Sequence, residues 1–82
     1  MKILLLRQDI ENYLRKRALG KKFAKQKELF EVNPFHPSLK TELLEPKWLR
    51  VWSFRIDRQY RAIFIFHNNE TAEIVDINNH YG

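Results

Sequence analysis

Hydrophobic positions near the start of the chain suggest a short strand and then a helix. Residues 2–6 are a brief apolar run, typical of a buried first strand or of the lead into a helix. Ile10, Tyr13 and Leu14 then recur at i, i+3 and i+4, which is the spacing of one helix face. Asp9 precedes this pattern, and we expect it to be the N-cap because its carboxylate can accept from the free N–H groups of a first turn.

A second helical pattern follows. Phe23 and Phe30 lie on one face of it, and we expect Gly20 to end or kink the first helix. The second helix should stop at Asn33-Pro34, since proline restricts the residue before it and cannot continue the hydrogen-bond ladder. The two segments are predicted to pack as a helical hairpin.

The second half of the chain has the texture of strands. Residues 33–47 hold all three prolines and are predicted to be a loop. Aromatic and β-branched residues then fill Trp48–Ile56, Tyr60–Phe66 and Thr71–Ile77, and short polar segments separate these runs. Three consecutive strands with tight links predict an antiparallel meander. The fold class is therefore α+β, in a single domain over residues 1–82.

Alternation within these strands divides the sheet into two faces. In the middle strand, Ala62 and Phe64 share a face that we expect to pack on the helices, and Arg61 lies on the other. Arg55 shares this other face on the neighbouring strand. Two guanidinium groups side by side suit a phosphate, because each offers a planar fork of donors. The alternative is an arginine paired with a carboxylate, for which the third strand offers Glu73 or Asp76.

Composition excludes several classes of protein. The chain is 44% hydrophobic and therefore not disordered, and it has no cysteine, which excludes a disulfide scaffold and a cysteine nucleophile. Its only glycines are Gly20 and Gly82, too few for a phosphate-cradling loop. The three histidines are 31 and 13 residues apart and lack metal-ligand spacing, so we expect no metal and no cofactor. The first seven residues are too short for a signal peptide or membrane span, so a soluble cytoplasmic protein is expected.

Positive charge is concentrated in one part of the chain. The net charge is +5, and residues 1–33 hold nine bases and four acids, whereas residues 34–82 hold six of each. Seven bases without an intervening acid form a basic stripe: Arg15, Lys16, Arg17, Lys21, Lys22, Lys25 and Lys27. The stripe favours an anionic partner such as RNA or an acidic protein, and the alternative is a solvated helix face.

The remaining chemistry is acid–base chemistry. Cleavage of a phosphodiester needs a cation for the pentavalent intermediate and a proton donor for the leaving oxygen. His80 and Tyr81 follow the last predicted strand, from which they could fold back toward Arg61.

Three segments resemble one known family, the RelE/ParE toxin superfamily. The run of residues 52–64, Trp-Ser-Phe-Arg-Ile-Asp-Arg-Gln-Tyr-Arg-Ala-Ile-Phe, resembles the central block of that superfamily. Residues 33–40, Asn-Pro-Phe-His-Pro-Ser-Leu-Lys, are similar to the family's loop between helices and sheet, and Asn79-His80-Tyr81 resembles the ending of the YoeB-like branch. The likeness is strongest to the YoeB-like and HigB-like ribosome-dependent mRNA interferases.

The resemblance implies a small fold like that of microbial ribonucleases, with residues 2–6 as a first strand. It implies a toxin of a type II toxin–antitoxin pair that inhibits translation as an endoribonuclease. Such enzymes cut mRNA on the ribosome without a metal, and a cognate antitoxin neutralises them in a hetero-oligomer. By position, Arg61 matches the arginine that stabilises the transition-state phosphate, and Arg55 matches a basic sheet residue. His80 and Tyr81 match the C-terminal pair, as general acid and as base-stacking or leaving-group contact.

The resemblance leaves the general base open. The YoeB-like branch has a glutamate just before its Leu-Lys pair, where this chain has Pro37. His36, Glu42 or Glu45 replaces that glutamate, or the base is missing. Two other functions therefore stay open: a ParE-like toxin that inhibits DNA gyrase, and a catalytically silent family member that only binds its antitoxin.

Overall fold

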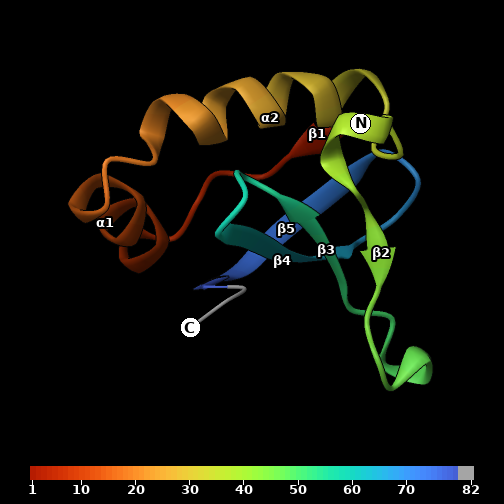
Figure 1. The fold of residues 1–82 in the computed structure, drawn as a ribbon. Helices are drawn as coiled ribbons and strands as arrows, with labels where there is room; N and C mark the ends of the chain where they lie inside the picture. Colours follow the sequence, from red (N-terminus) through yellow and green to blue (C-terminus); the bar gives the residue numbers. More distant parts are fainter. Residues whose placement is uncertain (80–82) are drawn as a thin grey trace.

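Five strands form one mixed sheet, and helix α2 covers one of its faces (Figure 1). The computed structural model describes residues 1–79. Its elements are β1 (Lys2–Ile3), α1 (Gln8–Lys16), α2 (Gly20–Val32), β2 (Glu42–Leu43), β3 (Trp52–Arg55), β4 (Tyr60–Phe66) and β5 (Thr71–Asn79), with 3-10 turns at Pro37–Leu39 and Lys47–Leu49. The strand order is β1-β5-β4-β3-β2, in which β1 is parallel to β5 and the other pairs are antiparallel.

The first strand is shorter than the apolar run that predicted it. Only Lys2–Ile3 pairs with β5, and Leu4 adds a backbone hydrogen bond of 2.9 Å to the carbonyl of Ala72. The strand is therefore confirmed within residues 2–6, with Ile3 buried in the core. Within residues 1–79, no helix is both long enough and apolar enough to cross a membrane.

The start and end of α1 differ from the prediction. The N-cap is Arg7, and Asp9 lies inside the first turn, where its carboxylate accepts from the Arg7 guanidinium at 3.0 Å and faces the positive end of the helix. The expected N-cap at Asp9 was thus wrong. At the other end, Ala18 takes the left-handed conformation (φ 55°), and the Leu19 amide donates to the Leu14 carbonyl at 2.8 Å. Gly20 does not terminate α1, because Ala18 already takes the left-handed position and Gly20 becomes the first residue of α2.

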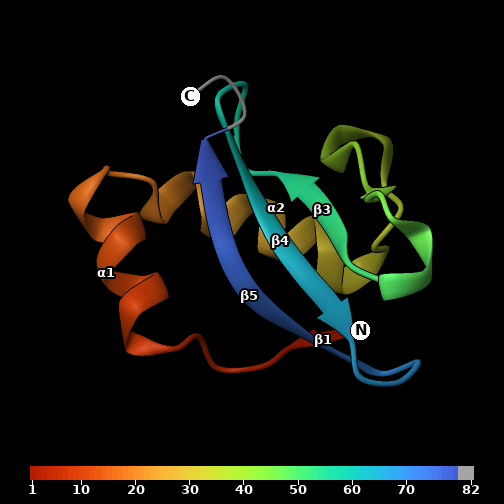
Figure 2. The same cartoon turned by 90° about the horizontal axis from the view of Figure 1, so that it is seen from below.

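Helix α2 ends at Val32 with Asn33 as its C-cap, as the Asn33-Pro34 pair predicts. The two views together show α1 lying across the N-terminal end of α2 rather than alongside it (Figures 1 and 2). The core lies between α2 and the sheet. Phe30 is fully buried there, with its ring centre 5.2 Å from that of Phe54 and 5.0 Å from that of Phe64.

The predicted strand at Trp48–Ile56 was too long at its start. Residues 47–49 form a 3-10 turn and Arg50 takes a left-handed conformation (φ 57°), so that strand pairing begins at Trp52. Conversely, β2 lies inside the predicted loop, because a two-residue strand is too short to show alternation. These segments form a hairpin that the sequence pattern did not predict.

The last two strands follow the prediction more closely. β4 has the predicted bounds, and β5 begins at Thr71 as expected but continues two residues further, to Asn79. Its register shifts beside Ile63 and Phe64 of β4. Because of this irregularity, Ile74 and Ile77 both face the core although they are three residues apart.

Candidate functional site

Arg55 and Arg61 face each other across the pair β3–β4, on the sheet face away from α2. Their strand neighbours Phe54 and Ala62 form the adjacent register pair and are fully buried. Period-two alternation therefore sends the two arginines to the outer face, as the sequence predicts. Strand pairing, rather than a flexible loop, sets the position of both residues.

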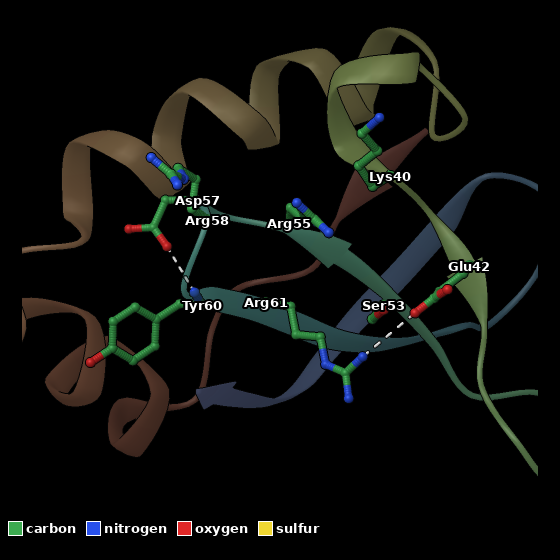
Figure 3. A pocket seen from close by; sticks show the side chains of 8 residues that line it. All are labelled: Lys40, Glu42, Ser53, Arg55, Asp57, Arg58, Tyr60 and Arg61. Atoms are coloured by element: carbon green, nitrogen blue, oxygen red, sulfur yellow. Dashed lines mark hydrogen bonds and ion pairs between the residues drawn. The ribbon is translucent and has the colours of Figure 1, made fainter. Parts of the chain in front are cut away.

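A cavity of about 210 Å³ opens beside these two arginines (Figure 3). Residues from β2, β3, β4 and the connections around them line it: Lys40, Glu42, Ser53, Arg55, Asp57, Arg58, Tyr60 and Arg61. Four of these side chains are cations and two are carboxylates. The excess of positive charge in a concave site suits an anion.

Two neighbours hold the Arg61 guanidinium. Its Nε donates to Oδ1 of Asn78 on β5 at 3.0 Å, and its Nη1 lies 3.5 Å from Oε1 of Glu42 on β2. Asn78 thus contacts the Nε of the guanidinium, and Glu42 lies beside Nη1. The side chain of Arg61 is only 24% exposed, whereas that of Glu42 is 61% exposed.

The ion pair of Arg61 is not the one considered from sequence. Glu73 contacts the His67 ring at 2.7 Å, and Asp76 accepts from the backbone amide of Ile77 at 2.9 Å. The carboxylate beside Arg61 is instead that of Glu42, on β2, a strand that the sequence pattern did not predict. The side chains of Arg55, Lys40 and Arg58 make no ion pair or hydrogen bond within residues 1–79, so these three cations are available to a ligand.

Asp57 shapes the turn between β3 and β4. Its Oδ1 accepts from the backbone amides of Gln59 and Tyr60 at 2.9 and 2.7 Å, and its Oδ2 accepts from the Lys22 ammonium at 3.0 Å. Burial alone would raise the pKa of Asp57, but the hydrogen bonds from Tyr60, Lys22 and Gln59 outweigh it and hold the pKa below its ordinary value. The ionised carboxylate thus fixes the turn that carries Arg58 into the cavity.

Gln26 connects two segments that border the cavity, the end of β3 and the 3-10 turn at Pro37–Leu39. This residue of α2 is nearly buried, and its amide nitrogen donates to the carbonyl of Arg55 at 2.8 Å and to that of Ser38 at 3.3 Å. The first contact holds the end of β3. The second holds the 3-10 turn before Lys40, whose left-handed conformation (φ 50°) leads the chain into β2.

The structure separates the three candidates for a general base. Glu42 lines the cavity beside Arg61. His36 does not line it, and its Nδ1 accepts from the amide of Ser38 at 3.1 Å as the N-cap of a 3-10 turn. Glu45 lies exposed in the connection between β2 and β3 and does not line the cavity either.

The two remaining candidates, His80 and Tyr81, lie outside the described residues. The last described residue, Asn79, pairs in register with Tyr60, which lines the cavity. The chain therefore reaches the end of β5 beside this site.

The basic stripe is divided between the end of α1 and the first half of α2, which meet at an angle (Figure 1). Arg15 donates to Asn12 at 2.7 Å, and the Arg17 guanidinium lies 3.6 Å from the centre of the Tyr13 ring. Lys22 is paired with Asp57 and so lies next to the cavity. The other members, Lys16, Lys21, Lys25 and Lys27, make no ion pair within residues 1–79.

Sequence analysis missed three cationic or aromatic lining residues: Lys40, Arg58 and Tyr60. For Arg58 and Tyr60, the sequence pattern contained a signal that could have placed them at the site. The tight turn that joins the strands of Arg55 and Arg61 must lie at the same end of the sheet, which places Arg58 and Tyr60 nearby. Lys40 reaches the site through its left-handed backbone and the β2–β3 pairing, and neither shows in a hydropathy pattern.

Comparison with known proteins supports the predicted fold. No family model matches the chain, and no curated protein matches it. Among solved structures, the chain is similar to a YoeB/ParE toxin from Agrobacterium tumefaciens, with a TM-score of 0.72 and 21% sequence identity over 99% of this chain and 100% of that one. The chain thus shares its fold with that toxin over nearly its whole length.

Proposed function

We propose that this chain is the toxin of a toxin–antitoxin pair and a metal-independent endoribonuclease that cuts mRNA on the ribosome. One observation carries the proposal: Glu42 lies 3.5 Å from Arg61 inside a cavity that also holds Lys40, Arg55 and Arg58. A carboxylate beside an oriented guanidinium, among further cations, is a set of groups that cleavage of a phosphodiester by its own 2′-hydroxyl needs. The likeness in fold to a YoeB/ParE toxin agrees with it.

The reaction would proceed by attack of the ribose on the adjacent phosphate. Glu42 takes the proton of the 2′-hydroxyl while O2′ forms a bond to phosphorus. Arg61, oriented by Asn78, binds the non-bridging oxygens as negative charge develops on them. The bond from phosphorus to the 5′-oxygen then breaks, and that oxygen takes a proton from His80. The products are a 2′,3′-cyclic phosphate and a 5′-hydroxyl.

The other cations would bind the flanking phosphates. Arg55 has no partner within residues 1–79 and lies directly opposite Arg61, so it can take the second oxygen of the scissile phosphate. Lys40 and Arg58 lie at the cavity wall and suit the neighbouring backbone. Tyr81 would stack on a base or contact the leaving group.

The basic stripe would bind ribosomal RNA. Lys21 lies in the first turn of α2, which has no acidic residue, so its charge opposes the helix dipole. Lys21 therefore costs some helix stability, and binding of an anion at this position would offset that cost. An acidic segment of the antitoxin is the second partner that this surface would accept.

Primer extension on a translated reporter mRNA, after brief induction of the chain, tests the proposal. We expect new cuts inside translated codons, which are lost with Arg61→Ala and with Glu42→Gln. Glu45→Gln is the matched control, because it removes a carboxylate three residues away that does not line the cavity. Removing one oriented donor for a developing oxyanion lowers a rate about 10²–10³-fold, so cutting by Arg61→Ala should be undetectable after brief induction.

The other outcomes separate the alternatives. Intact mRNA with arrested growth would favour a ParE-like gyrase inhibitor and would refute the ribonuclease. Intact mRNA with normal growth would favour a silent, antitoxin-binding protein. Cuts that persist in Arg61→Ala would remove that residue from the mechanism.

A further inference from the structure

The connection between β2 and β3 carries the most exposed tryptophan of the chain. Trp48 is 78% exposed, whereas Trp52 is partly buried against Phe35 and Phe66. An indole in water leaves a large apolar surface without partners, and such side chains are enriched where proteins bind something. Trp48 is therefore the feature of this face that the proposed chemistry does not use.

The backbone around Trp48 is closed rather than extended. Leu44 donates to Val51 at 2.8 Å where the hairpin begins, and Leu49 donates to Pro46 at 3.1 Å within the 3-10 turn. Arg50 donates to Lys47 at 3.1 Å and takes a left-handed conformation. The indole of Trp48 thus projects from a turn whose backbone is held by hydrogen bonds. Because this backbone is already ordered, less conformational entropy is lost when a ligand binds.

The turn and the cationic cavity lie at opposite ends of β3. Figure 1 shows α2 on one side of the sheet and the green turn at residues 47–49 beyond the opposite face. Viewed from that side in Figure 2, the turn lies at the border of the sheet next to β3. β3 itself runs from Trp52, next to the turn, to Arg55, whose side chain lines the cavity.

The charges beside Trp48 favour a nucleic acid over a protein. Lys47 and Arg50 flank the indole, and both are exposed, against the single carboxylate of Glu45. Lysine is depleted in the centres of protein interfaces. In contrast, an aromatic ring beside cations is the arrangement that binds single-stranded nucleic acid, because bases stack on the ring and phosphates contact the cations.

We infer that Trp48 is a stacking platform for one base of single-stranded RNA, and that Lys47 and Arg50 contact the phosphates beside that base. The strand would run from the cavity along β3 to the turn at residues 47–49. This inference rests on the proposed function, since it takes the occupant of the cavity to be RNA. It adds a binding subsite outside the cavity and several nucleotides from the cleaved bond.

Fluorescence anisotropy with a labelled single-stranded RNA of about eight nucleotides tests the inference. Trp48→Ala should raise Kd about 5- to 100-fold and should leave the salt dependence unchanged, because no phosphate contact is lost. Trp48→Phe should recover most of the affinity. Leu49→Ala is the matched control, an exposed apolar neighbour on the same turn, and should leave Kd within about twofold.

A spectroscopic measurement reports stacking directly. In a Trp52→Phe variant the emission comes from Trp48 alone, and we expect RNA to quench it. Unchanged emission at saturating RNA would overturn the inference.

The remaining outcomes are distinct. If Arg61→Ala weakens binding and Trp48→Ala does not, the stacking platform is refuted and the proposed function survives. If the parent binds no RNA, the stacking platform is refuted, whereas the primer-extension experiment still decides the proposed function. If Trp48→Ala instead converts a dimer to a monomer in sedimentation equilibrium and leaves RNA affinity unchanged, the turn binds a second copy of the chain and the inference is overturned.

Discussion

Replacing Gln26 by methionine should destabilise the walls of the cavity without changing its lining. Methionine has nearly the same length and volume, so packing is kept and only the two hydrogen bonds to Arg55 and Ser38 are lost. The shorter bond contributes roughly 1–2 kcal/mol, because its loss leaves a part-buried carbonyl without a donor, and the longer bond roughly 0.5–1 kcal/mol. The free energy of unfolding should therefore fall by about 1.5–3 kcal/mol.

Thermal and urea denaturation measure this loss. For a domain of this size, 1 kcal/mol corresponds to about 4–8 °C in Tm, so we expect Gln26→Met to lower Tm by about 6–24 °C. Lys27→Met is the matched control, because Lys27 is the next residue of α2 and its ammonium makes no ion pair within residues 1–79. The control should change Tm by no more than a few degrees.

The result that would refute this reasoning is a Gln26→Met protein whose Tm lies within about 2 °C of the parent. Such a result would mean that water satisfies the carbonyls of Arg55 and Ser38 as well as the amide does. A large fall in Tm for Lys27→Met would equally show that the loss is not specific to the hydrogen bonds.

Three further predictions follow from the core and the site. Asp57→Ala should lower the free energy of unfolding at pH 7 by about 1.5–3 kcal/mol. Because the pKa of Asp57 is depressed in the folded protein, the difference between parent and variant should be constant above pH 3.8, the ordinary pKa, and should shrink as the pH falls below it. Urea titrations across pH 2–7 measure this difference. A difference that grows in acid would contradict the assignment. Phe30→Ala should cost about 3–5 kcal/mol in the same assay, whereas Leu5→Ala, at a side chain 97% exposed, should cost nearly nothing. Arg55→Ala should leave Tm within about 2 °C yet reduce the salt dependence of RNA affinity by about one phosphate contact, and an unchanged slope would remove Arg55 from the RNA contact.

The sequence pattern predicted correctly those elements whose signals lie within a few neighbouring residues. β4 has successive side chains on opposite faces of the sheet, and its predicted bounds were right. The end of α2 at Asn33 was also right, because proline acts on the residue beside it.

Errors arose where two backbone conformations compete within a few residues. Gly20 was expected to end or kink the first helix, but Ala18 takes the left-handed conformation before it, and a hydrogen bond from the Leu19 amide to the Leu14 carbonyl stabilises this turn. Residues 48–50 have the composition of a strand, yet Arg50 turns the chain, so that Trp48 lies in solvent. Propensity is a weak prior there, because one or two hydrogen bonds in a turn contribute as much free energy as the local preference.

The sequence by itself determined that Arg55 and Arg61 share the outer face of a sheet, because period-two alternation sends every second side chain to the same side. Only the tertiary structure decided which carboxylate meets Arg61. Glu42 reaches it through β2, a strand of two residues that pairs with β3. The two candidates considered from sequence have other partners: Glu73 contacts His67, and Asp76 accepts from the amide of Ile77. Contacts of this kind depend on pairing between distant segments, and the free energy that selects them appears only when both segments are in place.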